Sequence, residues 1–354
     1  MVTETRVLRE LFFLADNPFS PGEDTQRNFK FGTRGAYLNR ALNVFEVKEL
    51  LEYFVKVGYF KSAVEDLDNY FLNSDYPKGG AYPPAFYIYG ASGAGRSTMA
   101  YYIAHQIKER CKPAEAMLGE VLVKGSDLAK HLFSIKGFIK RHVKNQPGHP
   151  GLEIIEEIET QMTAAEPNER LLKEMFAMLR PSMIGLPPLI LIMENLEYIH
   201  HDRWFGELYT NLRNLNVVFI FIGDDALADR FEGLLRSEEI SGLKVSLSSL
   251  DQKTGTEFLQ QRVDTFRLPT FPDTADPLFP FFEQPLAVAF KDPPVLNLRY
   301  LLNLLNTAFK LKLKILTPLY SNQRATDEPP QLCEKDLRIT AELIEESIKT
   351  LMKK

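Results

Sequence analysis

A glycine-rich turn between an apolar run and a helical pattern constrains this chain of 354 residues more than any other feature. The apolar run is Phe86–Tyr89, and the helical pattern extends from Thr98 to about Arg110. Strand, turn and helix in this order are the context that the phosphate-binding pattern G-x-x-x-x-G-K-[ST] requires. The glycines let successive backbone N–H groups and the helix N-terminus face one anion. The sequence therefore predicts nucleotide binding through Gly90, Ser92, Gly93, Ala94, Gly95, Arg96, Ser97 and Thr98.

Two positions of this turn bear on its chemistry. Arg96 stands where the pattern has lysine, and it keeps the positive charge while replacing a compact ammonium with a planar fork. Ser97 stands where the pattern has the hydroxyl that binds Mg²⁺. The pattern thus indicates ATP and Mg²⁺ as cofactors, and it supports binding more strongly than hydrolysis. The alternative is a strand-to-helix turn that needs glycine only for its shape.

Two later apolar runs, Leu189–Met193 and Val217–Ile222, indicate strands buried on both faces, as in a parallel sheet. Strands that alternate with helices in this way predict a doubly wound α/β fold, which binds ligands at the carboxyl ends of its strands. Acidic residues follow both runs. In P-loop proteins such acids hold the Mg²⁺ shell or polarise the attacking water. The candidates are Glu194 for metal binding and catalysis, Asn195 and Glu197 for catalysis, and Asp224 for cofactor binding.

Helical patterns cover much of the remaining chain. Helices are predicted over 3–15, 152–164, 251–266 and 297–314, and from Thr340 to about Met352, with a further strand over 119–124 and a loop over 317–334. The predicted organisation is an N-terminal helix and arm (1–43), a helical lead-in (44–84), a P-loop α/β domain (85–250) and a helical domain (251–354).

Composition narrows the class of protein. Hydrophobic residues make up 45% and charged residues 25% of the chain, as in ordinary globular proteins. The net charge of −5 argues against a surface made entirely for nucleic acid. No stretch reaches the roughly 18 apolar residues of a membrane span, and no secretory signal precedes the first helix. We therefore expect a cytoplasmic protein with no membrane partner.

One segment, residues 130–144, combines five lysines and arginines with interleaved apolar residues. This pattern is typical of an amphipathic helix with a solvated basic face. The alternative is a surface for an acidic partner or for nucleic acid.

The order of these motifs resembles the AAA+ ATPase family, including its STAND and origin-recognition branches, over roughly residues 44–354. Gly90–Ser97 resembles the Walker A loop, Leu189–Glu197 the Walker B strand, and Val217–Asp225 the strand that ends at sensor 1. The resemblance implies a P-loop parallel sheet sandwiched by helices, with an N-terminal helical extension and a C-terminal helical lid. It also implies that Arg299 is the sensor 2 arginine, and that Arg230 or Arg236 reaches the nucleotide of a neighbouring subunit.

The sequence departs from the family pattern where the chemistry takes place. Arg96 replaces lysine, Glu194 replaces aspartate, and Asn195 stands where the catalytic glutamate is expected. Asparagine can orient water but cannot take its proton, whereas Glu197 remains available as a base. These departures beside an intact glycine frame favour weak or absent hydrolysis.

The leading hypothesis is an ATP-binding AAA+-like protein that uses nucleotide as a conformational or assembly switch. The resemblance implies protein partners, or self-association into a ring or filament, within a multi-subunit complex such as a bacterial conflict or defence system. One alternative is a competent AAA+ ATPase that loads onto or remodels DNA, as origin-recognition and transposition regulators do. Another is a scaffold that has lost nucleotide binding.

Overall fold

The structure is a computed structural model of the chain. It describes residues 4–15, 17–19, 58–74, 76, 83–91, 93–111, 115–120, 137, 140, 151–164, 174–175, 177–178, 186–194, 196, 216–237, 241–247, 249–272, 275–281, 287–290, 297–324 and 334–352. The elements are α1 (Glu4–Leu11), α5 (Gly58–Asn73), β1 (Ala85–Gly90), α6 (Arg96–Arg110), β2 (Glu115–Glu120), α8 (Gly151–Ala164), β3 (Leu189–Glu194), β4 (Val217–Ile222), α11 (Asp225–Ser237), β5 (Gly242–Leu247), α12 (Gln252–Phe266), α14 (Leu298–Arg324), α15 (Glu334–Leu337) and α16 (Ala341–Met352).

The described strands form one five-stranded sheet in the order β2-β3-β4-β1-β5, and every pair is parallel. Each residue of β4 is buried, and β3 is buried up to its last residue. Strands that are covered on both faces consist of continuous apolar runs. For this reason, both strands could be predicted from the sequence. The predicted α/β class with a parallel sheet between helices is confirmed.

The two faces of the sheet are covered by different helices. Phe86 and Ile88 of β1 belong to a hydrophobic core that also includes α5 and α6, and α6 packs against β1, β3 and β4. Tyr87 points the other way and stacks on Phe231 of α11 with ring centroids 5.2 Å apart. Side chains that alternate between faces along one strand thus place α6 on one side of the sheet and α11 on the other.

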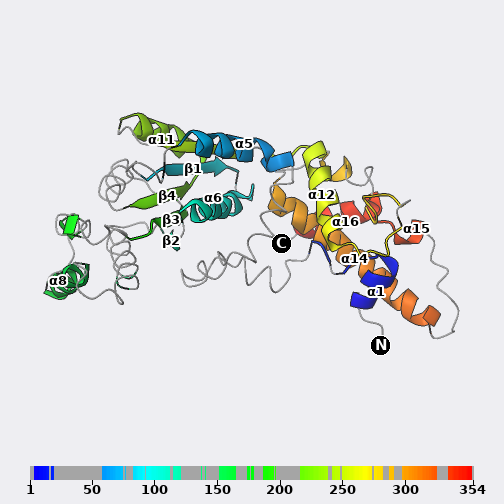
Figure 1. The fold of residues 1–354 in the computed structure, drawn as a ribbon. Helices are drawn as coiled ribbons and strands as arrows, with labels where there is room; N and C mark the ends of the chain where they lie inside the picture. The colour runs from blue at the N-terminus through cyan, green and yellow to red at the C-terminus, as the bar shows by residue number, and fades with distance from the viewer. Residues whose placement is uncertain are drawn as a thin grey trace.

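A helical lid lies beside the sheet and consists of α12, α14, α15 and α16 (Figure 1). Asp251 caps α12 by accepting a hydrogen bond of 2.7 Å from the amide of Thr254. The Thr254 side chain in turn accepts a hydrogen bond from the backbone amide of Asp251. The helix α14 packs against α16 and also against α1 from the start of the chain. The expected C-terminal helical lid is therefore present, and the N-terminal helix lies against it.

The N-terminal residues 4–15 and 17–19 are held against the lid by both backbone and side-chain contacts. Leu14 pairs with Arg267 in an antiparallel bridge, and the amide of Ala15 donates to the carbonyl of Phe266 over 2.7 Å. Phe12 and Phe19 are buried, and each lies 5–6 Å from Phe309 between ring centroids, at 5.2 and 6.2 Å. The core of the lid thus combines residues that precede the sheet in the sequence with residues that follow it.

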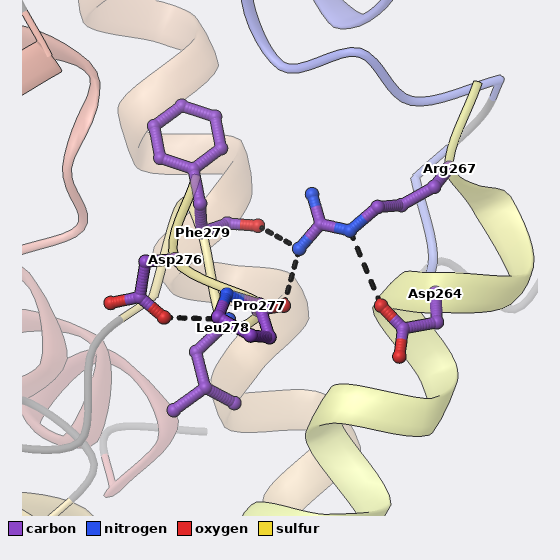
Figure 2. Close-up of polar contacts among 6 residues, drawn as sticks. All are labelled: Asp264, Arg267, Asp276, Pro277, Leu278 and Phe279. Carbon is purple, nitrogen blue, oxygen red and sulfur yellow. Dashed lines mark hydrogen bonds and ion pairs between the residues drawn. The ribbon is translucent and has the colours of Figure 1, made fainter. Parts of the chain in front are cut away.

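Arg267 organises the turn that follows α12 (Figure 2). Its guanidinium donates to Asp264 at 3.2 Å and to the carbonyl of Phe279 at 3.1 Å, and it also donates to the carbonyl of Pro277. The same group lies 3.6 Å from the ring centroid of Phe271, a cation–π contact. One arginine therefore holds Phe271, Pro277 and Phe279 against the end of α12.

Two elements differ from the sequence expectation. Strand β2 is at Glu115–Glu120 and not at 119–124, because its pairing with β3 sets the register and its own sequence lacks a clear apolar period. The helix α14 continues past Pro318 to Arg324, where a loop was expected. Burial of Leu316 and Tyr320 on either side of the proline keeps the helix packed, while Pro318 itself is exposed. Within the described part of the chain, no helix has the length and apolar character needed to cross a membrane.

We expect Phe12→Ala to destabilise the lid strongly, since it removes a fully buried ring that contacts Phe309 and Phe279. The loss should be about 3–5 kcal/mol in the free energy of unfolding. Leu72→Ala is the control, because Leu72 is 79% exposed, and it should change stability by less than about 0.5 kcal/mol. Calorimetric unfolding of both variants measures these losses. Equal losses of stability in the two variants would contradict the burial of Phe12.

Candidate nucleotide-binding site

The glycine-rich turn joins β1 to α6 at the carboxyl edge of the sheet. Gly90, Gly93 and Gly95 have φ values of +132°, +85° and +93°, in the region that favours glycine. A Cβ atom on Gly90 would lie 2.3 Å from the carbonyl oxygen of Leu247 in β5. The turn closes with a hydrogen bond of 3.0 Å from the Ala94 amide to the Ala91 carbonyl. The glycines are thus required by both dihedral angle and space.

The first turn of α6 presents its amides to the glycine-rich turn. Met99 donates to the Gly95 carbonyl over 3.0 Å, so the amides of Arg96, Ser97 and Thr98 stand at the helix start. Amides in the first turn of a helix lack acceptors within the helix and carry a partial positive charge. Ser97 and Thr98 are half-buried beside them. This arrangement suits an anion such as a phosphate group.

The lid contacts the same turn through the start of α14. The amide of Arg299 donates to the carbonyl of Gly93 over 3.2 Å. Asn297 accepts from the amide of Tyr300 at 2.9 Å and so caps the helix. A Cβ atom on Gly93 would lie 2.6 Å from the side-chain oxygen of Asn297. The structure therefore brings Arg299, whose side chain is exposed, to the edge of the turn.

Arg96 turns toward the end of β4. Its guanidinium donates a hydrogen bond to the carbonyl oxygen of Gly223, the residue that follows the strand. The Gly223 amide in turn donates to the Ile88 carbonyl in β1 over 3.1 Å. Arg96 thus joins the glycine-rich turn to the neighbouring strand.

Asp224 serves as the N-cap of α11. Its side-chain oxygen accepts from the amide of Leu227 at 3.1 Å, and its own carbonyl accepts from the Tyr87 hydroxyl at 2.8 Å. Aspartate is among the preferred residues at such a position, because it satisfies an amide of the first turn. The structure places Asp224 at the carboxyl edge of the sheet, one residue beyond the contact with Arg96.

Glu194 lies at the end of β3 and is half-buried. Burial raises the pKa of the Tyr101 hydroxyl on α6, and the negative charge of Glu194 raises that pKa further. The carboxylate thus lies close to the second turn of α6. Since β4 alone separates β3 from β1 in the sheet, Glu194 and the glycine-rich turn share one edge. Asn195, Glu197 and Ser92 lie outside the described residues, as does most of the basic segment 130–144.

The two candidate arginines for a neighbouring subunit are on α11. Arg230 and Arg236 are both exposed, and Arg236 pairs with Glu232 one turn earlier. Lys244 of β5 also contacts Glu232, and this contact is the largest cause that lowers the pKa of the Glu232 carboxyl. Arg236 is thereby held along the helix. Arg230 precedes Arg236 by nearly two turns and so lies about 9 Å closer to the carboxyl edge of the sheet along the helix axis.

Sequence reasoning did not assign a site role to Asn297, Gly223 or Tyr87. The signal for Asn297 was present, because asparagine before a helical pattern is a typical N-cap. For Gly223 and Tyr87 the sequence contained no such signal. A Cβ atom on Gly223 would lie 2.2 Å from the Tyr87 hydroxyl oxygen, and the two residues come this close only in the folded sheet. Among the described residues, no three His, Cys, Asp or Glu side chains are grouped as they would be around a metal ion.

Comparison with known proteins yields structural likeness only. No family profile and no curated protein matches the sequence. The Aeropyrum pernix ORC2 protein, in ADPNP–ADP complexes, is 13% identical over 83% of this chain and 68% of its own, with a TM-score of 0.46. The ORC1 protein of the same organism, in complex with DNA, is 13% identical over 88% of this chain and 68% of its own, with a TM-score of 0.45.

We expect Gly90→Ala to destabilise the fold, because the new methyl group meets the Leu247 carbonyl and the dihedral angle disfavours a side chain. The loss should exceed about 2 kcal/mol in the free energy of unfolding. Gly233→Ala is the matched control: a Cβ there meets nothing within 4 Å, and Gly233 is inside α11. It should add up to about 1 kcal/mol of stability. Chemical denaturation measures both, and a neutral Gly90→Ala would contradict the crowding at this turn.

Proposed function

We propose that this chain is an ATP-binding AAA+-like protein in which nucleotide acts as a conformational or assembly switch, with weak or absent hydrolysis. The observation that carries the proposal is the contact between the glycine-rich turn and the start of α14. The amide of Arg299 and the carbonyl of Gly93 are joined there by a hydrogen bond of 3.2 Å. A phosphate group on the turn thus lies between the sheet and the lid and affects how they meet.

The residues present fit a nucleotide with Mg²⁺. The amides at the start of α6 would hold phosphate oxygens, and the Ser97 hydroxyl and Glu194 carboxylate would hold the metal shell. When bound, the nucleotide supplies several negative charges and, with Mg²⁺, a phosphoryl group open to attack by water. Arg96 and Arg299 are the cations beside it. Binding favours whichever arrangement of sheet and lid has the higher affinity for nucleotide.

The groups proposed for hydrolysis depart from what that reaction needs. Glu194 lies beside the buried Tyr101, and Asn195 follows it where a carboxylate base would stand. Glu197 is the remaining candidate base. Slow or absent hydrolysis suits a protein in which bound ATP stabilises one conformation or assembly.

Assembly is the second part of the proposal. Arg230 and Arg236 are exposed on α11, where they can meet a neighbouring copy or another subunit of a complex. A repeated contact of this kind closes into a ring or continues as a filament. The alternative function, an ATPase that loads onto DNA, depends on the basic segment 130–144. Lys140 of that segment lies 3.5 Å from Glu159, which offsets part of its charge.

The first test is ATP binding by calorimetry, with phosphate release followed on the same sample. We expect micromolar binding and release at background level. Ser97→Ala and Arg299→Ala should each weaken binding about tenfold, the effect of losing one contact to a charged group. Arg6→Ala is the charge-matched control, because Arg6 pairs with Glu10 on the exposed side of α1, and it should leave the affinity unchanged.

Three results would contradict the proposal in different ways. Absence of binding would leave the turn as a structural element and support the scaffold alternative. Steady turnover that is lost in Glu194→Gln or Glu197→Gln would identify an active ATPase. ATP-dependent binding of duplex DNA, lost on removal of charge from residues 130–144, would favour the DNA-loading function.

A further inference from the structure

The hydrogen bond from Arg96 to Gly223 points to a role for the arginine beyond contact with phosphate. We infer that Arg96 is a positioning residue, which holds the β4–α11 junction in the nucleotide-free protein and releases it when phosphate draws the guanidinium away. The inference rests on the proposed nucleotide binding, and it specifies how that binding reaches α11.

The junction is held by a short series of contacts to the backbone. The Gly223 amide donates to Ile88, and the Tyr87 hydroxyl donates to the Asp224 carbonyl at 2.8 Å. The Asp224 side chain then caps α11 through Leu227. Of the contacts named here, the one from Arg96 alone comes from the glycine-rich turn. It therefore links phosphate on the turn to the position of α11.

Phosphate competes for the same donor with an advantage of charge. The Gly223 carbonyl is neutral, whereas a phosphate oxygen is ionised, so the Arg96 guanidinium forms an ion pair with phosphate, which it cannot form with the carbonyl. Arg96 is the first residue of α6, so its side chain begins beside the amides that would hold the phosphate. A bound phosphate is thus expected to take the guanidinium and leave Gly223 without this donor.

The consequence falls on the helix that carries the candidate assembly arginines. Loss of a donor at Gly223 weakens the support of the strand end that leads into α11. The first turn of α11 then opens more often, and Arg230 in the second turn becomes more mobile. Arginine suits this role better than lysine, because its longer planar fork reaches the carbonyl, while the shorter ammonium is a point charge.

The test is hydrogen–deuterium exchange of the peptide covering residues 225–237, with and without ATP. In the natural protein, saturating ATP should raise exchange in the first turn of α11 roughly tenfold, the factor for loss of one hydrogen bond with a charged partner. Arg96→Ala should show this faster exchange without ATP and should not respond to it. Arg96→Lys should bind ATP within about threefold of the natural affinity yet exchange like Arg96→Ala, since it keeps only the charge.

Arg299→Ala is the matched control, because it removes the other arginine beside the turn and leaves Gly223 untouched. It should bind ATP more weakly but exchange normally in its free state. Calorimetry on the same samples measures ATP binding separately from its effect on exchange in α11. ATP that binds without altering exchange in α11 would overturn the inference, since Arg96 would then be a fixed structural tie.

Normal exchange in nucleotide-free Arg96→Ala would overturn the inference as well, because the hydrogen bond from Arg96 to Gly223 would then not stabilise the first turn of α11. Absence of ATP binding in the natural protein would instead refute the proposed function, and with it the release step. A folded state of Arg96→Ala is checked by its circular dichroism, and Arg96→Lys provides the same comparison if the alanine variant does not fold.

Discussion

A backbone hydrogen bond between two distant segments connects the glycine-rich turn to the lid. It joins the Arg299 amide to the Gly93 carbonyl over 3.2 Å, and it forms because Gly93 has no side chain and a φ of +85°. A Cβ atom at this position would lie 2.6 Å from the side-chain oxygen of Asn297, so the N-cap of α14 would have to shift. The same glycine therefore shapes the glycine-rich turn and allows the start of α14 to lie against it. The turn is thus in contact with both the sheet and the lid.

The lid in turn depends on a segment from the opposite end of the sequence. Residues 4–19 precede the sheet, whereas α12, α14 and α16 follow it, yet Phe12 and Phe19 are buried in the lid core. The Tyr320 hydroxyl donates to Glu10, so even the far half of α14 is joined to α1. Movement of the lid relative to the sheet would carry this N-terminal segment along. The lid and this N-terminal segment thus form one packed unit, although they are remote from each other in sequence.

Much of the fold was predictable because it depends on local pattern. The buried strands β3 and β4 are uninterrupted apolar runs, and Asp251 before a helical pattern marked the start of α12. The missed features depend on contacts made only after folding. Strand β2 takes its position from pairing with β3, and α14 passes Pro318 because buried neighbours hold it on both sides. The closeness of Gly223 to Tyr87 likewise has no trace in the sequence.

The candidate site illustrates the same difference between pattern and folded structure. The sequence predicted Arg96 and Asp224 as cofactor-binding residues, and it gave no sign that both also support the scaffold. In the folded chain Arg96 holds the end of β4, and Asp224 caps α11. A phosphate that engages Arg96 has to compete with a contact inside the protein, so part of its binding free energy goes into a change of structure. A ligand shifts a conformational equilibrium only through such a difference in affinity between states. Residues shared between site and scaffold are a physical basis for that difference, and they favour a switch over a site that binds nucleotide without consequence.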